Sequence, residues 1–533
     1  MNDTLILKEL SRYPLGTFAD LIYRNALLYP DQEAFVCGSH RIDFRQFNKR
    51  VNAIVHGLQD MGIQKGDVMG IISWNRLEYP EVFGAAMKGG FVLAHFSPRL
   101  KPHELEHLIN DSRARVLFFG PEFQGPMKTI QDQLSKTQAF VSFGESESGI
   151  TGYKDLLEGH PTQEPRIEIQ KQDPLVIFYT SGTTGIPKGA VYNQEQKMQN
   201  TQIKALDLGL QFGDRHLMVL PMFHVGGDSH VWPFFLTGGC NVLLPHASFD
   251  PVEALQTVAD ERITDIHIVP TQLISLLDVL EKRQFDLSSL KRIWYAASPM
   301  PVEVLKRGLS VFGPLFFQGY GQTESGPHTT VLSKVAHQTA LASDTQVLAS
   351  CGQPCLGVHM RVVDDKDNDL MPGQIGEIIV RSDRIMSSYW DNPGETQEAM
   401  KDGWLRTGDL GYYDERGFIY IADRKKDMIV TGGENVYPKE VEEVLYRHQA
   451  VAEAAVIGVP DPYWVERVHG VVVLKEEASA SEKDIIQFCK AHMAAYKTPK
   501  SIAFVDALPK SPQGKILKRE LKKGFQPVRP SSA

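Results

Sequence analysis

A dense group of glycines and hydroxyls follows the apolar segment 174–179. The ten residues 180–189 contain three glycines, four hydroxylated side chains and one lysine, Lys188. Glycines let backbone N–H groups approach a ligand, hydroxyls donate hydrogen bonds and the ammonium supplies charge, so the run predicts a phosphate-binding loop. A polar surface turn would account for Gly-Thr-Thr-Gly alone. The predicted phosphate-binding residues are Thr180, Ser181, Gly182, Thr183, Thr184, Gly185 and Lys188.

Two further features narrow the chemistry of this loop. A Walker loop requires Ser or Thr directly after its Gly-Lys pair, whereas Lys188 is preceded by Pro187 and followed by Gly189. In a second, glycine-flanked segment Glu324 follows Thr323. A carboxylate beside bound phosphates makes sense if it holds a divalent cation, and Mg²⁺ is the natural choice. Alone, Thr-Glu is more often a solvated turn or a helix cap.

The run YTSGTTGIPKGA resembles the signature loop of the adenylate-forming superfamily, which includes acyl-CoA synthetases, peptide-synthetase adenylation domains and firefly luciferase. The resemblance continues, in the family's order, through four more segments and covers the chain from about residue 175 to its end. The first 170 residues fit the family's length without a motif of their own. The four segments are Pro221–Gly227, Gly319–Ser325, Arg406–Pro438 and Pro509–Leu521.

The resemblance implies a nucleotide site. Thr323 would contact the α-phosphate, and Glu324 with Thr184 would hold Mg²⁺. Tyr320 would offer a flat face to adenine. Asp409 would accept hydrogen bonds from the ribose hydroxyls, with Arg424 as its partner. Further residues that the resemblance assigns to this site are Gly319, Gly321, Ser298 and Pro299, the last two in the segment AASPM.

The resemblance also implies residues that act during the reaction. Lys515 would bridge the carboxylate and the α-phosphate during adenylation, whereas the other lysines near it are typical of a solvated basic tail. Lys426 would be the hinge about which the small domain turns, and the pair Gly432 and Gly433 would then reach the pantetheine channel. Many relatives have glycine where Val465 stands, and this departure concerns the coenzyme A channel.

His224 lies where the family has an aromatic residue or histidine that gates the acyl pocket. A packed core histidine is the alternative, because nothing in the sequence fixes its partner. Amino-acid-activating relatives carry an aspartate in this register, so His224 argues against an amino acid substrate.

Composition and charge exclude several other classes. The formal net charge of -9 argues against nonspecific nucleic-acid binding. Five scattered cysteines are typical of reduced thiols. Neither a signal peptide nor an apolar stretch approaching the ~18 to 20 residues of a transmembrane helix is visible, so we expect a soluble, cytoplasmic protein. Assembly into a homodimer is left as an open alternative.

The order of apolar segments predicts an α/β fold. Residues 67–72, 79–88 and 91–96 read as strand, helix and strand, which is the β-α-β pattern of a largely parallel sheet. Near Asp423 the regular alternation of strand and helix segments ends, and separate strand and helix segments follow. We therefore expect a large N-terminal domain of α/β sheets covered by helices, residues 1–424, and a small mobile α+β domain, residues 425–533.

Together these features predict an acid–thiol ligase of the AMP-forming type, closest to the fatty-acid–CoA ligases. ATP, Mg²⁺ and coenzyme A would be its cofactors, and a small-molecule carboxylic acid its substrate. TGGENVYPKEVEE favours a medium- or long-chain fatty acid. The alternatives are an aromatic or alicyclic acid, transfer of the acyl-adenylate to a carrier protein, or a catalytically dead adenylate sensor. The presence of Lys515 and Glu324 argues against the last.

Overall fold

The computed structural model describes residues 8–180, 187–245, 248–298, 300–425, 427–431, 434–461, 464–476, 478–510 and 516–524. Ten of the 21 predicted site residues therefore lie outside the described residues. These are Ser181, Gly182, Thr183, Thr184, Gly185, Pro299, Lys426, Gly432, Gly433 and Lys515.

An eight-stranded sheet forms one half of the large domain, in the order β19-β9-β8-β4-β3-β5-β6-β7. Its strands from β7 to β8 run parallel, and β9 and β19 add an antiparallel edge. The predicted β-α-β pattern is confirmed here, because β3, α4 and β4 follow one another. The strands are β3 (Val68–Ile72), β4 (Val92–Phe96), β5 (Val116–Phe119), β6 (Ala139–Ser142), β7 (Thr151–Gly152), β8 (Pro174–Thr180), β9 (Lys188–Asn193) and β19 (Ser388–Tyr389), and the helices α4 (Glu78–Gly89), α5 (Pro102–Ser112), α6 (Gln124–Ile130) and α7 (Tyr153–Glu158).

A nine-stranded sheet forms the other half, in the order β16-β15-β14-β13-β12-β10-β11-β1-β2. Its strands are β1 (Glu33–Cys37), β2 (His40–Asp43), β10 (Arg215–Met218), β11 (Cys240–Leu243), β12 (Asp265–Ile268), β13 (Arg292–Tyr295), β14 (Phe316–Gln322), β15 (Gly326–Leu332) and β16 (Gln353–Pro354). Its helices are α2 (Phe18–Leu28), α3 (Phe44–Asp60), α8 (Gln194–Leu208), α9 (Val225–Leu236), α10 (Pro251–Asp260), α11 (Pro270–Leu280), α12 (Val302–Phe312) and α13 (Lys334–Ser343).

One hydrophobic core joins these two sheets. It contains Met69 and Leu93 from the eight-stranded sheet, Phe35 and Met218 from the nine-stranded sheet, and the indole of Trp232 on α9. Burial of large apolar side chains is the main favourable term in folding, so this shared core fixes the two sheets relative to each other. The loops at the ends of their strands therefore have a rigid base.

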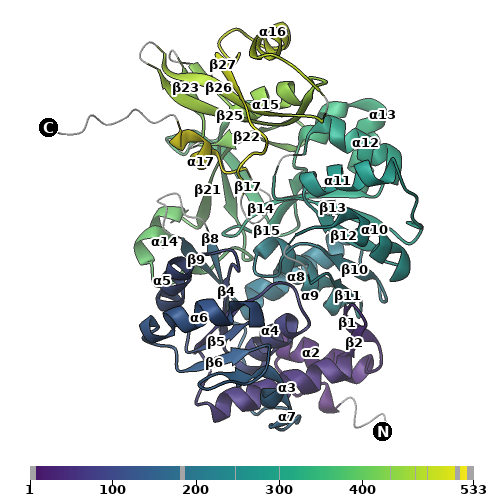
Figure 1. Ribbon diagram of the computed structural model, residues 1–533, viewed down its shortest axis with the longest axis vertical. Coiled ribbons are helices and arrows are strands. Elements are labelled where there is room, and N and C mark those ends of the chain that lie inside the picture. Colours follow the sequence, from purple (N-terminus) through teal and green to yellow (C-terminus); the bar gives the residue numbers. More distant parts are fainter. Residues whose placement is uncertain are drawn as a thin grey trace, which may run out of the picture.

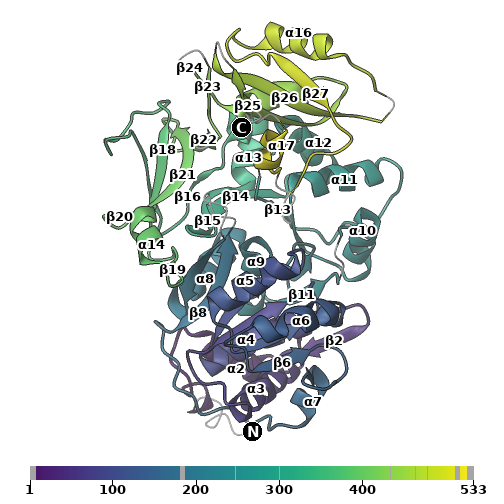
Figure 2. The same cartoon turned by 60° about the vertical axis from the view of Figure 1, so that its left-hand side comes forward.

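A third sheet, built from residues 359–424, is entirely antiparallel among its described strands and was not part of the predicted pattern. Local turns explain it, because Asp402 and Gly403 both have positive φ (52° and 77°), as the two-residue hairpin between β20 and β21 requires. Figure 2 shows this sheet with α14 at one side of the molecule. Its elements are β17 (His359–Val363), β18 (Gly376–Arg381), β20 (Met400–Lys401), β21 (Trp404–Tyr413), β22 (Ile419–Arg424) and α14 (Pro393–Ala399).

The C-terminal elements form a small α+β unit with its own core, at the top of Figure 1. This confirms the predicted fold class. Helix α17 packs back toward β22, because Lys518 Nζ lies 2.9 Å from Glu442 and 3.9 Å from Asp423. The elements are β23 (Ile429–Thr431), β24 (Glu434–Val436), β25 (Val451–Asp461), β26 (Val465–Leu474), β27 (Ser501–Phe504), α15 (Pro438–Tyr446), α16 (Glu482–His492) and α17 (Lys518–Lys523).

Within the described ranges, no helix is both long enough and apolar enough to cross a membrane.

Candidate active site

Asp409 is the most completely hydrogen-bonded of the predicted site residues that the structure describes. It lies on β21 directly opposite Arg424 on β22, and the Oδ1 to Nε distance is 2.7 Å. Its Oδ2 accepts hydrogen bonds from the Tyr320 hydroxyl and from Gln322 Nε2, each at 2.6 Å. A carboxylate offers about four lone-pair positions, so Asp409 is held rigidly and can still accept from a ligand.

The charges around Asp409 are fixed by these contacts. Burial alone would lower the pKa of Arg424, but Asp409 and, to a smaller extent, Tyr320 and Glu324 raise it, so the guanidinium stays charged. Burial, and then the Asp409 carboxylate, raises the pKa of Tyr320 well above its ordinary value. Tyr320 is therefore a neutral hydrogen-bond donor, and its ring is held in place beside the carboxylate.

Glu324 lies in the turn between β14 and β15. Its Oε1 accepts a hydrogen bond from the Tyr389 hydroxyl at 3.0 Å, and its carbonyl accepts one from Met386 N at 2.9 Å. The carbonyl of Thr323 accepts from the Tyr192 hydroxyl at 2.5 Å. The turn is thereby fastened to β9 and β19. One protein carboxylate fits the habit of Mg²⁺ in nucleotide sites, where one or two carboxylates are joined by phosphates and water.

Strands β8 and β9 form an antiparallel hairpin in which Thr180 pairs with Lys188. The glycine- and hydroxyl-rich segment therefore connects two strands, whereas a Walker loop leads into a helix. Lys188 forms an ion pair with Glu395 on α14, and its Nζ lies 5.4 Å from the centre of the Tyr389 ring. The hydroxyl of the same ring contacts Glu324. Tyr389 therefore links Lys188, at the end of the loop, to the predicted metal ligand.

Residues 22–390 match the family described as AMP-binding enzyme, and residues 440–515 match the AMP-binding enzyme C-terminal domain. The chain belongs to the AMP-binding enzymes. It is a member of their AMP-forming acid–thiol ligases, and the predicted superfamily is confirmed.

Relatives of this AMP-binding enzyme carry several acyl substrates in their names. A feruloyl-CoA synthase of Amycolatopsis is 33% identical, over 94% of this chain and 98% of its own. A long-chain-fatty-acid–CoA ligase of Salmonella typhimurium is 32% identical, over 95% and 94%. The crystal structure of an anthranilate CoA ligase with anthranoyl-AMP is 28% identical and has a TM-score of 0.89, over 97% of this chain and 99% of that one.

Packing accounts for two of the predicted site glycines. A Cβ on Gly319 would overlap the indole of Trp294, and one on Gly321 would overlap the carbonyl oxygen of Gly326. Both positions need glycine for the fold of β14, whatever the ligand. Ser298 is half-buried in the turn after β13, where Ala297 adopts a φ of +74°. Such a left-handed residue is strained, and strained residues cluster at active sites and ligand-binding turns.

His224 caps the N-terminus of α9. Its Nδ1 accepts a hydrogen bond from Gly226 N at 3.2 Å, and the ring is half-buried. Capping gives this histidine a structural role that the sequence did not indicate. Its predicted gating of the acyl pocket stays a prediction.

Three residues that contact the predicted site residues were missed by sequence reasoning. Gln322 donates to Asp409, Tyr389 donates to Glu324, and Glu395 pairs with Lys188. Gln322 stands inside the segment Gly319–Ser325 and could have been found there. Tyr389 and Glu395 belong to no motif, and only the pairing of the short strand β19 with β9 brings them in.

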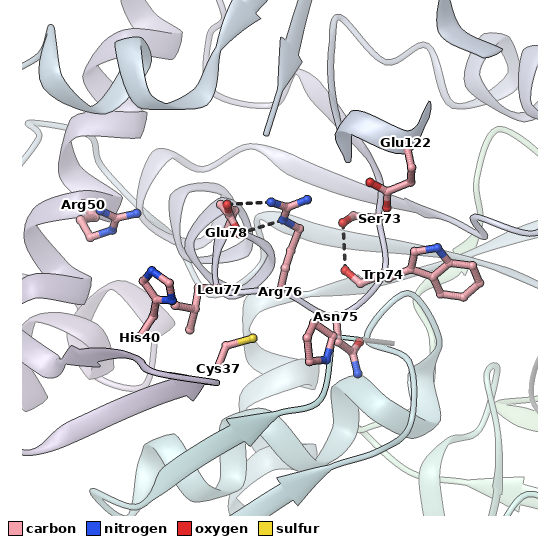
Figure 3. Close-up of a pocket in the computed structure, with 11 residues that line it drawn as sticks. Cys37, His40, Arg50, Ser73, Trp74, Asn75, Arg76, Leu77, Glu78 and Glu122 are labelled. Atoms are coloured by element: carbon pink, nitrogen blue, oxygen red, sulfur yellow. Dashed lines mark hydrogen bonds and ion pairs between the residues drawn. The ribbon is translucent and has the colours of Figure 1, made fainter. Parts of the chain in front are cut away.

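Figure 3 shows a hollow of about 600 Å³ in another part of the enzyme, near the ends of β1 and β3. Arg76 lies toward Glu78 in this view, at 2.8 and 3.0 Å. Of the predicted site residues with described positions, none lines this hollow. We therefore assign it no part in the nucleotide site.

One group of described side chains has the composition of a metal site but does not include Glu324. The potential ligand atoms of Asp207, His328 and Cys355 lie within 4.8 Å of one another. His328 Nε2 is already hydrogen-bonded to Asp207 at 3.1 Å. Burial, and then Asp207, raises the pKa of the Cys355 thiol despite the nearby Arg384. A protonated thiol beside a guanidinium is a poor ligand for a cation.

Proposed function

We propose that the enzyme is an ATP-dependent acid–CoA ligase. A carboxylic acid and ATP would give an acyl-adenylate and pyrophosphate, and coenzyme A would then displace AMP to give the acyl-CoA. The observation that carries the proposal is the carboxylate of Asp409, which Arg424, Tyr320 and Gln322 hold from three sides. This arrangement suits a ribose hydroxyl, because the carboxylate is preorganised and keeps about one acceptor position.

The remaining nucleotide contacts follow from this placement. The ring of Tyr320 would face adenine, with Ser298 and Pro299 beside it. The hairpin loop from Thr180 to Lys188 and the turn at Thr323 would bind the phosphates. Mg²⁺, held by Glu324 and Thr184, would supply neutralisation of the pyrophosphate charge. For Lys188 to reach a phosphate it must leave Glu395, so nucleotide binding would compete with this ion pair.

In the first reaction an oxygen of the carboxylic acid attacks the α-phosphorus of ATP, and the bond from this phosphorus to pyrophosphate breaks. We assign to Lys515 the neutralisation of charge at that centre. In the second reaction the sulfur of coenzyme A attacks the acyl carbon, and the bond from this carbon to AMP breaks. The small domain, residues 425–533, would turn about Lys426 between the two reactions and bring Gly432 and Gly433 to the thiol.

Two classes of acid are candidates. Sequence motifs favour a medium- or long-chain fatty acid, and an aromatic or alicyclic acid is the second choice. The names of relatives support both. Carrier-protein transfer is the remaining alternative for the second reaction.

Acid-dependent pyrophosphate release, measured with and without coenzyme A across acetate, octanoate, palmitate, benzoate and cyclohexane carboxylate, tests the proposal. Lys515→Ala should lower pyrophosphate release by orders of magnitude, while thioester formation from supplied acyl-adenylate survives. Lys510→Ala is the matched control, because Lys510 pairs with Glu453 at 2.6 Å. Equal loss of both reactions in Lys515→Ala would contradict the role of Lys515. Absence of pyrophosphate release with every acid would refute the proposed function.

A further inference from the structure

Four histidines and one lysine are buried together inside the large domain. We call His216, His230, His267, His328 and Lys204 the buried histidine cluster; none of them exposes more than 3% of its surface. The ring centres of His230 and His267 are 4.0 Å apart, and those of His216 and His230 are 5.3 Å apart. Nζ of Lys204 lies 4.7 Å from the ring centre of Trp294.

Most of these polar groups have unused hydrogen-bonding capacity. Nε2 of His230, Nδ1 of His216 and Nδ1 of His328 have no hydrogen-bond partner among the described residues. Neither ring nitrogen of His267 makes a well-formed hydrogen bond to the described part of the chain, although the Gly226 backbone is near enough to oppose the lowering of its pKa. Unpaired buried polar atoms are rare in native proteins, and several in one place call for a ligand or water.

The cluster adjoins the proposed acid site. His230 and His224 lie on the same helix, α9, with His224 as its N-cap. Trp294, which His230 and His328 contact edge-on at 5.6 and 5.8 Å, packs directly against Gly319 on β14. Thr329, which follows His328 on β15, donates a hydrogen bond to the Tyr320 carbonyl at 3.0 Å. The polar side chains therefore lie directly behind the strand and helix end that would flank the acyl group.

The four imidazoles of the cluster are uncharged at neutral pH. Burial, and then the neighbouring histidines and Lys204, lowers the pKa values of His230 and His267 well below the ordinary value. Burial likewise lowers the pKa of Lys204. Its Nζ donates to Ser229 Oγ at 2.9 Å, while Asp228 forms an ion pair with Lys197. A neutral imidazole has one donor and one acceptor nitrogen, which is the complement of a hydroxyl. An alkyl chain would leave every one of these atoms unpaired.

We propose that the buried histidine cluster binds a hydroxyl group on the acyl part of the substrate, so that the enzyme selects hydroxylated acids over their unsubstituted parents. The inference rests on the proposed function and names the substrate class of that site. The hydroxyl can be carried by a ring or by an alkyl chain, and matched acid pairs distinguish these sources. A dicarboxylic acid would introduce a second carboxylate charge that the neutral imidazoles do not compensate.

The first experiment needs no variant. We compare kcat/KM for pyrophosphate release with 4-hydroxycinnamate and cinnamate, and with 10-hydroxydecanoate and decanoate, and decanedioate serves as the charged analogue. We expect one hydroxylated acid to exceed its parent by about 10- to 100-fold, the typical penalty for leaving buried polar groups unpaired. Equal values within both pairs, or a preference for decanedioate, would overturn the inference. Activity with some acid in the panel separates this failure from failure of the proposed function.

His230→Leu supplies the second experiment, because leucine removes the unpaired nitrogen and keeps an apolar side chain. We expect kcat/KM for the hydroxylated acid to fall about tenfold or more and that for the parent acid to stay or rise. His337→Leu is the matched control: His337 is also buried, but its nitrogens pair with the Ser333 carbonyl and the Tyr295 hydroxyl at 2.8 and 3.0 Å. The same change in both variants would contradict a specific role for His230.

Discussion

Asp409 and Arg424 are direct cross-strand neighbours on β21 and β22, and their side chains form a 2.7 Å ion pair. The pair lies at the last residue of β22, immediately before the segment in which the proposed hinge Lys426 stands. Because Asp409 pairs with the last residue of β22, the proposed ribose contact lies next to the boundary between the two proposed domains. This arrangement makes Asp409 the most direct place to test nucleotide binding.

Asp409→Asn should weaken ATP binding. The amide keeps the size of the side chain but removes the negative charge that faces Arg424 and gives up an acceptor oxygen, so we expect KM for ATP to rise about 10- to 100-fold. Steady-state pyrophosphate release at varied ATP measures the effect. Asp369→Asn is the control, because Asp369 forms an exposed pair with Arg361. An unchanged KM for ATP in Asp409→Asn would contradict the proposed contact between Asp409 and the nucleotide.

Tyr389→Phe should impair adenylation without abolishing it. The substitution keeps the ring beside Lys188 but removes the hydroxyl that donates to Glu324 at 3.0 Å. A hydrogen bond to a charged group contributes about 1.5–3 kcal/mol, so we expect roughly a tenfold or larger fall in kcat and an altered Mg²⁺ concentration for half-maximal rate. Tyr413→Phe is a comparable change away from Glu324. Identical Mg²⁺ titrations for Tyr389→Phe and the wild type would count against the metal role of Glu324.

The sequence predicted the fold class and the regular β-α-β region well, because these depend on local periodicity. Strand 67–72, helix 79–88 and strand 91–96 correspond to β3, α4 and β4 within one or two residues. The antiparallel sheet from 359 to 424 could not be predicted in the same way, since its strands pair through hairpins. Tyr389 and Glu395 were missed because their positions depend on the pairing of β19 with β9, which are nearly 200 residues apart.

The buried histidine cluster was also invisible in the sequence. Its members stand on α8, β10, α9, β12 and β15, and each one alone is an ordinary residue of an amphipathic or apolar segment. Only the order of strands in the nine-stranded sheet brings β10, β12 and β15 close enough for their side chains to share one polar interior. Sequence motifs predict the reaction, whereas the proposed preference for hydroxylated acids rests on residues that only the topology brings together.

Val465→Gly should stabilise the protein. Val465 adopts a φ of +70° at the start of β26, where a β-branched side chain is strained, and 70% of its surface is exposed. The departure from glycine noted in the sequence therefore stands at a backbone conformation that glycine adopts freely. Relief of the strain stabilises the folded state, and the greater flexibility of glycine in the unfolded chain offsets part of this gain. The net effect should raise the free energy of unfolding by about 1 kcal/mol. Urea unfolding measures it, with Val430→Gly, a partly exposed strand position, expected to destabilise instead.

Acid should destabilise the protein through the buried histidine cluster. Burial lowers the pKa of His216 to about 3 and that of His328 to about 4, from an ordinary value of 6.5. Between pH 6.5 and 4 the unfolded chain therefore binds more protons than the folded one, and stability falls as pH falls. Above pH 6.5 both states are neutral at these rings, and the contribution to stability is fully present.

The size of this effect can be isolated with His216→Leu. Each such histidine steepens the dependence of the unfolding free energy on pH by at most about 1.4 kcal/mol per unit in this window. Urea unfolding at pH 7.0, 6.0 and 5.0 should give a shallower fall for His216→Leu than for the wild type. Replacement of the exposed His40 by leucine should leave the slope unchanged. If wild type and His216→Leu lost stability in parallel from pH 7.0 to 5.0, His216 would be protonated in the folded state, contrary to its burial.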